Sequence, residues 1–135
     1  MNALPFKAFL ALSGLVAISL GTMILFAPVA FYAGYGLDRA GQVTLLNELR
    51  SHGLSLIGIG TFVGTGAFTP RLTTIALAVS GFFYLSYGLS RLVSMAFDGW
   101  PVQGLVISGS VELAVGSLSL LIYLRHRGQS AFAPI

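Results

Sequence analysis

The sequence contains no cysteine and carries very little charge. Only 8% of its 135 residues are Asp, Glu, Lys or Arg, whereas a soluble domain usually has about 25%. Without cysteine, the chain has no disulfide bond, thiolate metal site or cysteine nucleophile. So few charges cannot cover a water-facing surface, and 56% of the residues are hydrophobic. Together with a mean hydropathy of +0.89, this composition predicts an integral membrane protein.

Motifs for nucleic-acid binding and catalysis are also missing. The net charge is +3, and no basic run is long enough to indicate a nucleic-acid partner. No Ser-His-Asp set, phosphate loop or redox motif is present, so we assign no catalytic residue. Glu48 is the nearest possible co-ligand of His52 at helical spacing, which is too weak a pattern to predict a metal site. Ligation of a haem or chlorin by His52 stays an alternative to an interior hydrogen-bonded role, so the cofactor is unknown.

Four apolar stretches are long enough to cross a bilayer, for which a helix needs about 20 apolar residues. They cover residues 6–26, 43–68, 72–97 and 102–124. The connection between the second and third is short, which places these helices side by side and antiparallel. The sequence therefore predicts an all-α, up-and-down four-helix transmembrane bundle that forms one domain over residues 1–135.

Basic residues indicate the orientation of this bundle. The end that carries both termini and the second connection has four basic residues and no acids: Lys7, Arg71, Arg125 and Arg127. Cytoplasmic loops of membrane proteins carry an excess of Lys and Arg. We therefore expect both termini to be cytoplasmic.

Glycines mark the faces on which the helices can approach closely. Small residues at helical spacing allow the backbones of two membrane helices to come into contact. Gly60-x-x-x-Gly64 is one such pattern, although it is common by chance in glycine-rich spans. The glycines assigned to helix packing are Gly14, Gly21, Gly53, Gly60, Gly64, Gly109 and Gly116.

Ionisable residues inside the spans form the candidate site. Each charge placed in hydrocarbon costs roughly 2.5–3.5 kcal/mol even on lenient insertion scales. The charges of Glu48, Arg50, Arg91 and Glu112 sum to zero, so we expect these side chains to meet and neutralise one another. In this arrangement one or both arginines reach Glu112, and the other acids, including Asp98, balance the second arginine.

Tyrosine and histidine side chains add hydrogen-bonding capacity near these charges. Tyr84 and Tyr87 share a polar stripe of the third span with Arg91, and His52 follows Glu48 by one helical turn, which allows the two to pair. Two interpretations stay open: a structural network that sets helix register, or an outward-opening polar pocket that binds a ligand. The complete candidate network is Glu48, Arg50, His52, Tyr84, Tyr87, Arg91, Asp98 and Glu112.

The polar residues of the spans resemble the pattern of a known family. The matching segments are Asn47-Glu48-Leu49-Arg50, Gly88-Leu89-x-Arg91, Asp98-Gly99-x-Pro101 and the in-span Glu112. The family consists of small bacterial four-helix membrane proteins catalogued only as a domain of unknown function, and its architecture is similar to the DoxX-like group. The resemblance extends from about Gly14 to Leu124. It implies the four-span fold and a bacterial inner (plasma) membrane location, and it implies no established activity.

The leading functional interpretation is a non-catalytic binding protein or accessory subunit rather than an enzyme. Its buried ionic site would hold a lipophilic or anionic ligand, or a partner in a larger membrane complex. Besides membrane lipids, the exposed small-residue faces make a homo-oligomer an expected partner. Two alternatives stay open: a small proton-coupled transporter acting as a dimer, and a membrane oxidoreductase or isomerase that acts on a lipid or quinone.

Overall fold

The computed structural model describes residues 4–131, with side chains described for residues 4–127. This part of the chain contains helices and no strand, which confirms the all-α prediction. The helices are α1 (Leu4–Phe26), α2 (Pro28–Ala33), α3 (Val43–Thr65), α4 (Pro70–Asp98) and α5 (Gln103–Ala131). Four of them are long, and α2 is a single short helix in the first connection.

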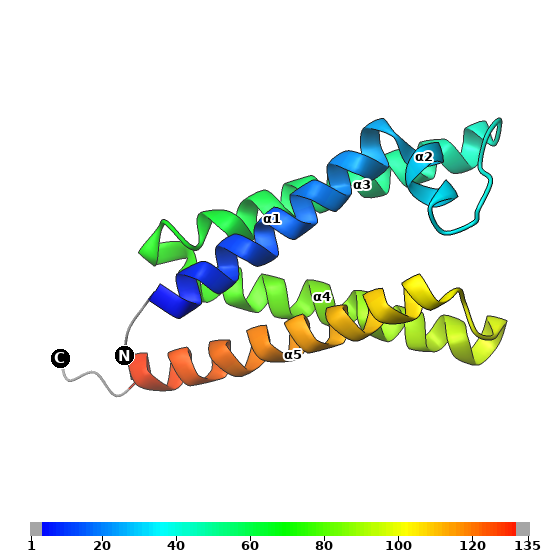
Figure 1. The fold of residues 1–135 in the computed structure, drawn as a ribbon. Coiled ribbons are helices and arrows are strands. Elements are labelled where there is room, and N and C mark those ends of the chain that lie inside the picture. Colours follow the sequence, from blue (N-terminus) through cyan, green and yellow to red (C-terminus); the bar gives the residue numbers. More distant parts are fainter. Residues whose placement is uncertain (1–3, 132–135) are drawn as a thin grey trace.

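The four long helices form two hairpins. Helix α1 packs along α3, and α4 packs along α5, while contacts between the hairpins are fewer and run mainly between α3 and α4. Figure 1 shows that the hairpins lie together where α1 begins and α5 ends, and diverge towards α2 and the α4–α5 turn. The bundle is therefore closed at one end and spread apart at the other.

Three of the helices have the length and composition of membrane spans. These are α1, α4 and the part of α5 from Gln103 to Arg127. Helix α3 is not among them, because its first half contains Asn47, Glu48, Arg50 and other polar residues. The prediction of a helical membrane protein is confirmed at this level. The fourth span and the cytoplasmic position of the termini stay predictions.

Glycine backbones form the contact between α1 and α3. A Cβ atom added to Gly14 would lie 2.6 Å from the carbonyl oxygen of Gly60, and one added to Gly53 would lie 2.8 Å from that of Gly21. The backbone nitrogen of Gly64 is 2.7 Å from the same Cβ position on Gly14. Real Cβ atoms do not approach backbone atoms this closely, so the two helices can pack as they do only with glycine at these positions.

Glycines also line the contact between α4 and α5. A Cβ atom on Gly116 would lie 2.6 Å from the backbone nitrogen of Leu85, and one on Gly88 would lie 3.0 Å from that of Leu113. Near the middle of this contact, the hydroxyls of Ser80 and Ser119 are buried and hydrogen bonded at 3.0 Å. Each hairpin is thus a tightly packed unit of its own.

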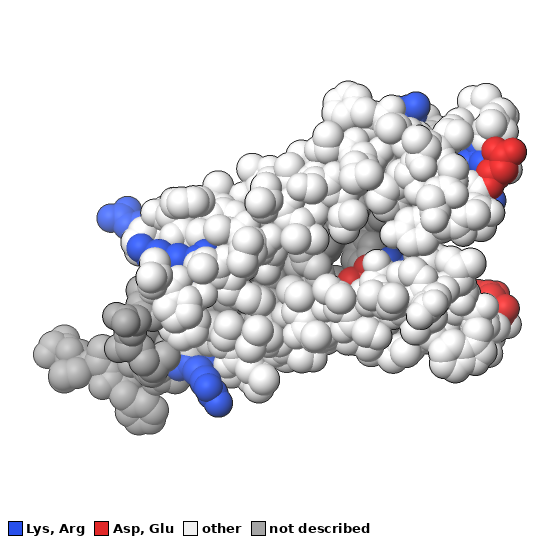
Figure 2. Space-filling model, viewed as in Figure 1, with Lys and Arg blue, Asp and Glu red and all other residues white. Residues whose placement is uncertain are grey.

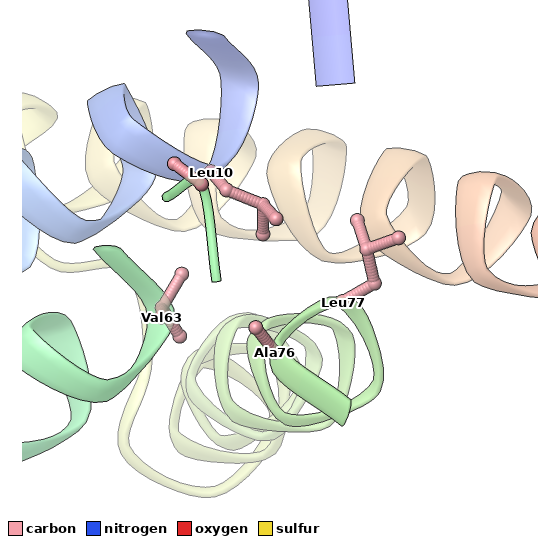
Figure 3. Close-up of a cluster of buried hydrophobic side chains, with 5 residues drawn as sticks. Leu10, Val63, Ala76 and Leu77 are labelled. Atoms are coloured by element: carbon pink, nitrogen blue, oxygen red, sulfur yellow. The ribbon is translucent and has the colours of Figure 1, made fainter. Parts of the chain in front are cut away.

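An apolar cluster joins the hairpins at the closed end. Its buried members come from α1, α3, α4 and the turn after α3: Leu10, Val63, Ala67, Ala76 and Leu77. Figure 3 shows Leu10, Val63 and the two α4 residues converging from the three helices. The buried hydroxyl of Tyr84 adds a polar link by donating to the carbonyl oxygen of Ser13 on α1 at 2.8 Å. Tyr84 therefore joins the two hairpins, and its hydroxyl is bonded to α1 rather than to Arg91 or Glu112.

Several helix ends differ from those predicted. Helix α3 ends at Thr65 instead of residue 68, because the chain turns at Gly66 towards Pro70. Pro70 then begins α4, two residues earlier than predicted, as expected for a proline in a first helical turn. Helix α5 continues beyond the predicted end at residue 124 to Ala131, and His126 lies on it within hydrogen-bonding distance of Thr74.

Candidate functional site

A bidentate ion pair between α4 and α5 forms the centre of the site. The Arg91 Nε atom donates to Glu112 Oε2 at 2.6 Å, and Nη2 donates to Oε1 at 2.8 Å. The two side chains retain 27% and 15% of their exposure, so neither is sealed from its surroundings. Charge-assisted bidentate pairs of this geometry are among the strongest polar interactions in proteins. The pair carries no net charge, which makes it tolerable inside a membrane.

Gly109 allows Arg91 to reach its partner. A Cβ atom at this position would lie 2.9 Å from Arg91 Cδ, so the aliphatic stem of the arginine lies directly over the glycine. Gly109 precedes Glu112 by almost one helical turn and therefore shares its face of α5. A side chain here would occupy the path that Arg91 takes across α5. The glycine assigned to helix packing thus also positions the ion pair.

A second polar contact joins α3 to α4 beside this pair. The hydroxyl of Tyr87 lies 2.7 Å from His52 Nδ1 and 3.1 Å from Nε2. The two rings are tilted against each other with centroids 5.3 Å apart. The charges of Arg91 and Glu112 both act on His52, so the imidazole lies within the electrostatic field of the ion pair. This contact is a polar bridge between the hairpins near the ion pair.

Tyrosines in and after α2 form the outer part of the site. Tyr35 lies against α5, since a Cβ atom on Gly104 would be 2.8 Å from its Cε1 atom. Tyr32 is half-buried, and burial raises the pKa of its hydroxyl while the Arg91 charge lowers it. Phe31 packs edge-on against both rings. The α2 segment therefore supplies an aromatic surface that faces the ion pair from the other hairpin.

These groups lie where the hairpins separate. Figure 2 shows a hollow between the two halves of the molecule, with acidic and basic atoms inside it. Within the described residues, α1 packs on α3 and α5 packs on α4, but α1 and α5 make no extended contact with each other. The hollow therefore opens on the side of the bundle, between α1 and α5 (Figure 2).

The expectation of one cluster containing all four charged residues is wrong. The side chain of Glu48 is exposed and makes no hydrogen bond or ion pair with any other described residue, including His52. Arg50 is exposed and is bonded to α1 rather than to Glu112. Asp98 is exposed at the end of α4, where it accepts a hydrogen bond from Ser94 at 2.9 Å. Of the four charged residues predicted to meet, Arg91 and Glu112 form an ion pair. Their charges cancel, so the pair needs no further charge to neutralise it.

Arg50 instead holds the end of α1. Its Nη1 atom donates to the carbonyl oxygen of Leu25. Leu25 belongs to the last turn of α1, where carbonyl groups lack partners within the helix and carry partial negative charge. Pro28, which has no N–H group, interrupts the regular helix directly after this turn. The arginine of α3 thus caps α1 and fixes the point at which the chain bends into α2.

We expect Arg50→Gln to destabilise the protein without changing the ion pair between Arg91 and Glu112. A hydrogen bond that involves a charged group contributes about 1.5–3 kcal/mol to stability, and we expect a loss near the lower end because Arg50 is exposed. Unfolding of the detergent-extracted protein by denaturant measures this loss. A variant as stable as the wild type would contradict the capping role.

The aromatic residues of the α2 segment were not among the residues predicted to form the site. The available signal was the run of Phe31, Tyr32 and Tyr35 after Pro28, which places several rings in one short connection.

Among the described residues, no group of three or more His, Cys, Asp or Glu is arranged to hold a metal ion.

Comparison with known proteins gives a match to a family. The model of a protein family described as a domain of unknown function, DUF4345, matches residues 5–123. No curated protein and no solved structure matches the chain. The similarity of its architecture to the DoxX-like group therefore stays a prediction.

Proposed function

The chain belongs to the DUF4345 family, whose function is unknown, and we propose from its geometry that it is a non-catalytic membrane protein that binds a small amphipathic ligand. The ligand occupies the hollow between the hairpins, with its polar group at the Arg91–Glu112 pair. The accessory-subunit form of this proposal, in which a partner protein uses the same site, is an alternative outcome of its test.

The proposal includes α3 as a fourth span. Helix α3 has 23 residues, as many as α1, and packs along α1 through glycine contacts. Its polar residues lie mainly in its first half, near the spread end of the bundle, where an interface with water would be. In this topology both termini are cytoplasmic, the hollow faces the outer half of the bilayer, and the protein resides in the bacterial inner membrane.

The incomplete burial of the ion pair supports a binding role. A pair that only fixed helix register would be enclosed by the helices that it joins. Arg91 and Glu112 instead retain 27% and 15% exposure, and acidic and basic atoms are visible in the hollow between the hairpins (Figure 2). Convergent polar groups within a concave, largely apolar site are characteristic of small-molecule sites. Intramembrane ionisable groups are also functional candidates by default.

Native mass spectrometry of the protein extracted in mild detergent tests this proposal. We expect the wild type to retain a molecule of lipid size, and the Arg91→Leu/Glu112→Leu variant to lose it. This double substitution keeps the site neutral, so it removes the polar groups without leaving an unpaired charge.

The matched control is Val93→Leu/Val111→Leu, which changes two exposed positions on the same helices. It should retain the ligand as the wild type does. Equal retention by the Arg91→Leu/Glu112→Leu variant, or no bound molecule in the wild type, would contradict the proposal. A protein partner bound in place of a lipid would support the accessory-subunit alternative.

A further inference from the structure

The opening of the hollow indicates the route by which a ligand enters. The ion pair lies between α4 and α5, and because α1 and α5 make no extended contact within the described residues, this hairpin is uncovered on one side. The long helices run side by side, so this side faces the bilayer when they span it (Figure 1). A ligand that reaches the pair by this route comes from the membrane and brings its hydrocarbon chains with it.

The depth of the pair fits a small headgroup. Helix α4 has 29 residues, so it is about 44 Å long and exceeds a hydrocarbon layer of about 30 Å by about 7 Å at each side. Arg91 lies about 10 Å from the end of α4 at Asp98, and Glu112 about 14 Å from the start of α5 at Gln103, at about 1.5 Å per residue. The pair is therefore a few ångströms below the boundary of the hydrocarbon.

The unused hydrogen-bonding capacity of the pair defines what it can recognise. Arg91 uses Nε and one Nη2 hydrogen on Glu112, which leaves further N–H groups free to donate. Each carboxylate oxygen of Glu112 accepts one hydrogen bond from Arg91 and retains capacity for another. The pair thus offers donors and acceptors side by side. A hydroxyl group satisfies both, because its oxygen accepts from Arg91 while its hydrogen is donated to Glu112.

Charge excludes the obvious competitor, an anionic headgroup. A phosphate has strong acceptors for Arg91, but its negative charge would lie beside the carboxylate of Glu112. Arg50 of the other hairpin could have balanced this charge, but it is bonded to the end of α1 and not to Glu112. A bound anion would therefore leave a net negative charge within the membrane, which is costly.

From this geometry we propose that the site selects an uncharged, hydroxyl-bearing lipid that enters sideways from the bilayer between α1 and α5. Diacylglycerols and long-chain alcohols have this chemistry. The inference rests on the proposed binding function and narrows its ligand class from amphipathic molecules in general to neutral lipid alcohols. The Arg91–Glu112 pair acts as the selectivity element because each member cancels the charge of the other.

Binding of two lipids with identical chains tests this inference. Dioleoylglycerol and dioleoyl phosphatidate are titrated separately into the delipidated wild-type protein in detergent, and bound fractions are read by native mass spectrometry. We expect dioleoylglycerol to bind at least about tenfold more tightly, a factor equivalent to about 1.4 kcal/mol. Glu112→Gln leaves Arg91 unpaired, so we expect this variant to reverse the preference towards phosphatidate.

The neutral variant Arg91→Gln/Glu112→Gln serves as the control for folding and charge. Its amide groups keep donors and acceptors without charge, so it should still prefer dioleoylglycerol. Equal or tighter binding of phosphatidate to the wild type would overturn the inference and leave the binding function standing. Binding of neither lipid would also overturn the inference, and if no molecule is retained after extraction either, the proposed binding function would be overturned with it.

Discussion

Replacing Gly60 with alanine is expected to destabilise the protein by about 1–3 kcal/mol relative to the same change at Gly58, because it overfills a packed interface. The new Cβ atom would lie 2.7 Å from the carbonyl oxygen of Gly14 and 2.9 Å from the Cβ atom of Ala17. Backbone atoms cannot rotate away as a long side chain can. Relief requires α1 and α3 to separate along their whole contact.

Gly58 is a matched control on the same helix. A Cβ atom there meets nothing within 4 Å, so Gly58→Ala adds only the general preference of a helix for alanine. That preference is common to both variants and cancels in the comparison. Reversible unfolding in mixed detergent micelles measures the difference. Equal stabilities of the two variants would show that α1 and α3 do not pack through their glycines.

Removal of either member of the ion pair is expected to cost more than removal of both. Breaking a buried ion pair typically destabilises a protein by about 3–5 kcal/mol because one charge is left uncompensated. Arg91 and Glu112 retain some exposure, so we expect about 2–4 kcal/mol for Glu112→Leu. Arg91→Leu should have a similar effect. The variant with both substitutions should be more stable than either single variant.

A double-mutant cycle isolates this coupling. The four proteins are the wild type, the two single leucine variants and the double variant, and their unfolding free energies are compared in one detergent. A large favourable interaction energy is the expected result, since contacting residues in one network do not behave additively. Additive effects of the two substitutions would contradict the direct pairing of the side chains.

The sequence predicted the parts of this fold that depend on local pattern. The apolar lengths located the four long helices to within a few residues, apart from the longer C-terminal end of α5. The glycine assignments rested on helical spacing, and Gly14, Gly53 and Gly60 all lie in the α1–α3 contact. Spacing is sufficient here because a close helix contact needs small residues at fixed intervals.

The partners of the charged residues depended on information that spacing does not contain. Charge neutrality requires a basic partner for Glu112, but it does not distinguish Arg50 from Arg91 as that partner. The position of Arg50 was decided by the end of α1, where the bend before Pro28 exposes carbonyl groups. Backbone acceptors compete with carboxylates for arginine, and a count of charges omits them.

The divergence of the two hairpins also could not be predicted from the sequence. The predicted contact between Arg50 and Glu112 requires the two hairpins to stay close together at this end of the bundle. The hairpins separate at that end, because the apolar cluster around Leu10 and Leu77 joins them only near the other end. The same separation leaves the ion pair partly open and creates the hollow. Such an angle depends on the packing of whole hairpins rather than on any local motif.

Infrared difference spectroscopy of Glu112 in lipid bilayers tests the central claim most directly, namely that an ionised acid–base pair lies within the membrane. Spectra of the wild type and Glu112→Gln are recorded under the same conditions, so that the exposed acids cancel. The account predicts carboxylate bands that disappear in the variant and that shift when dioleoylglycerol is added to the wild type. A protonated carboxylic acid band that only the wild type shows would contradict the pairing of Glu112 with Arg91.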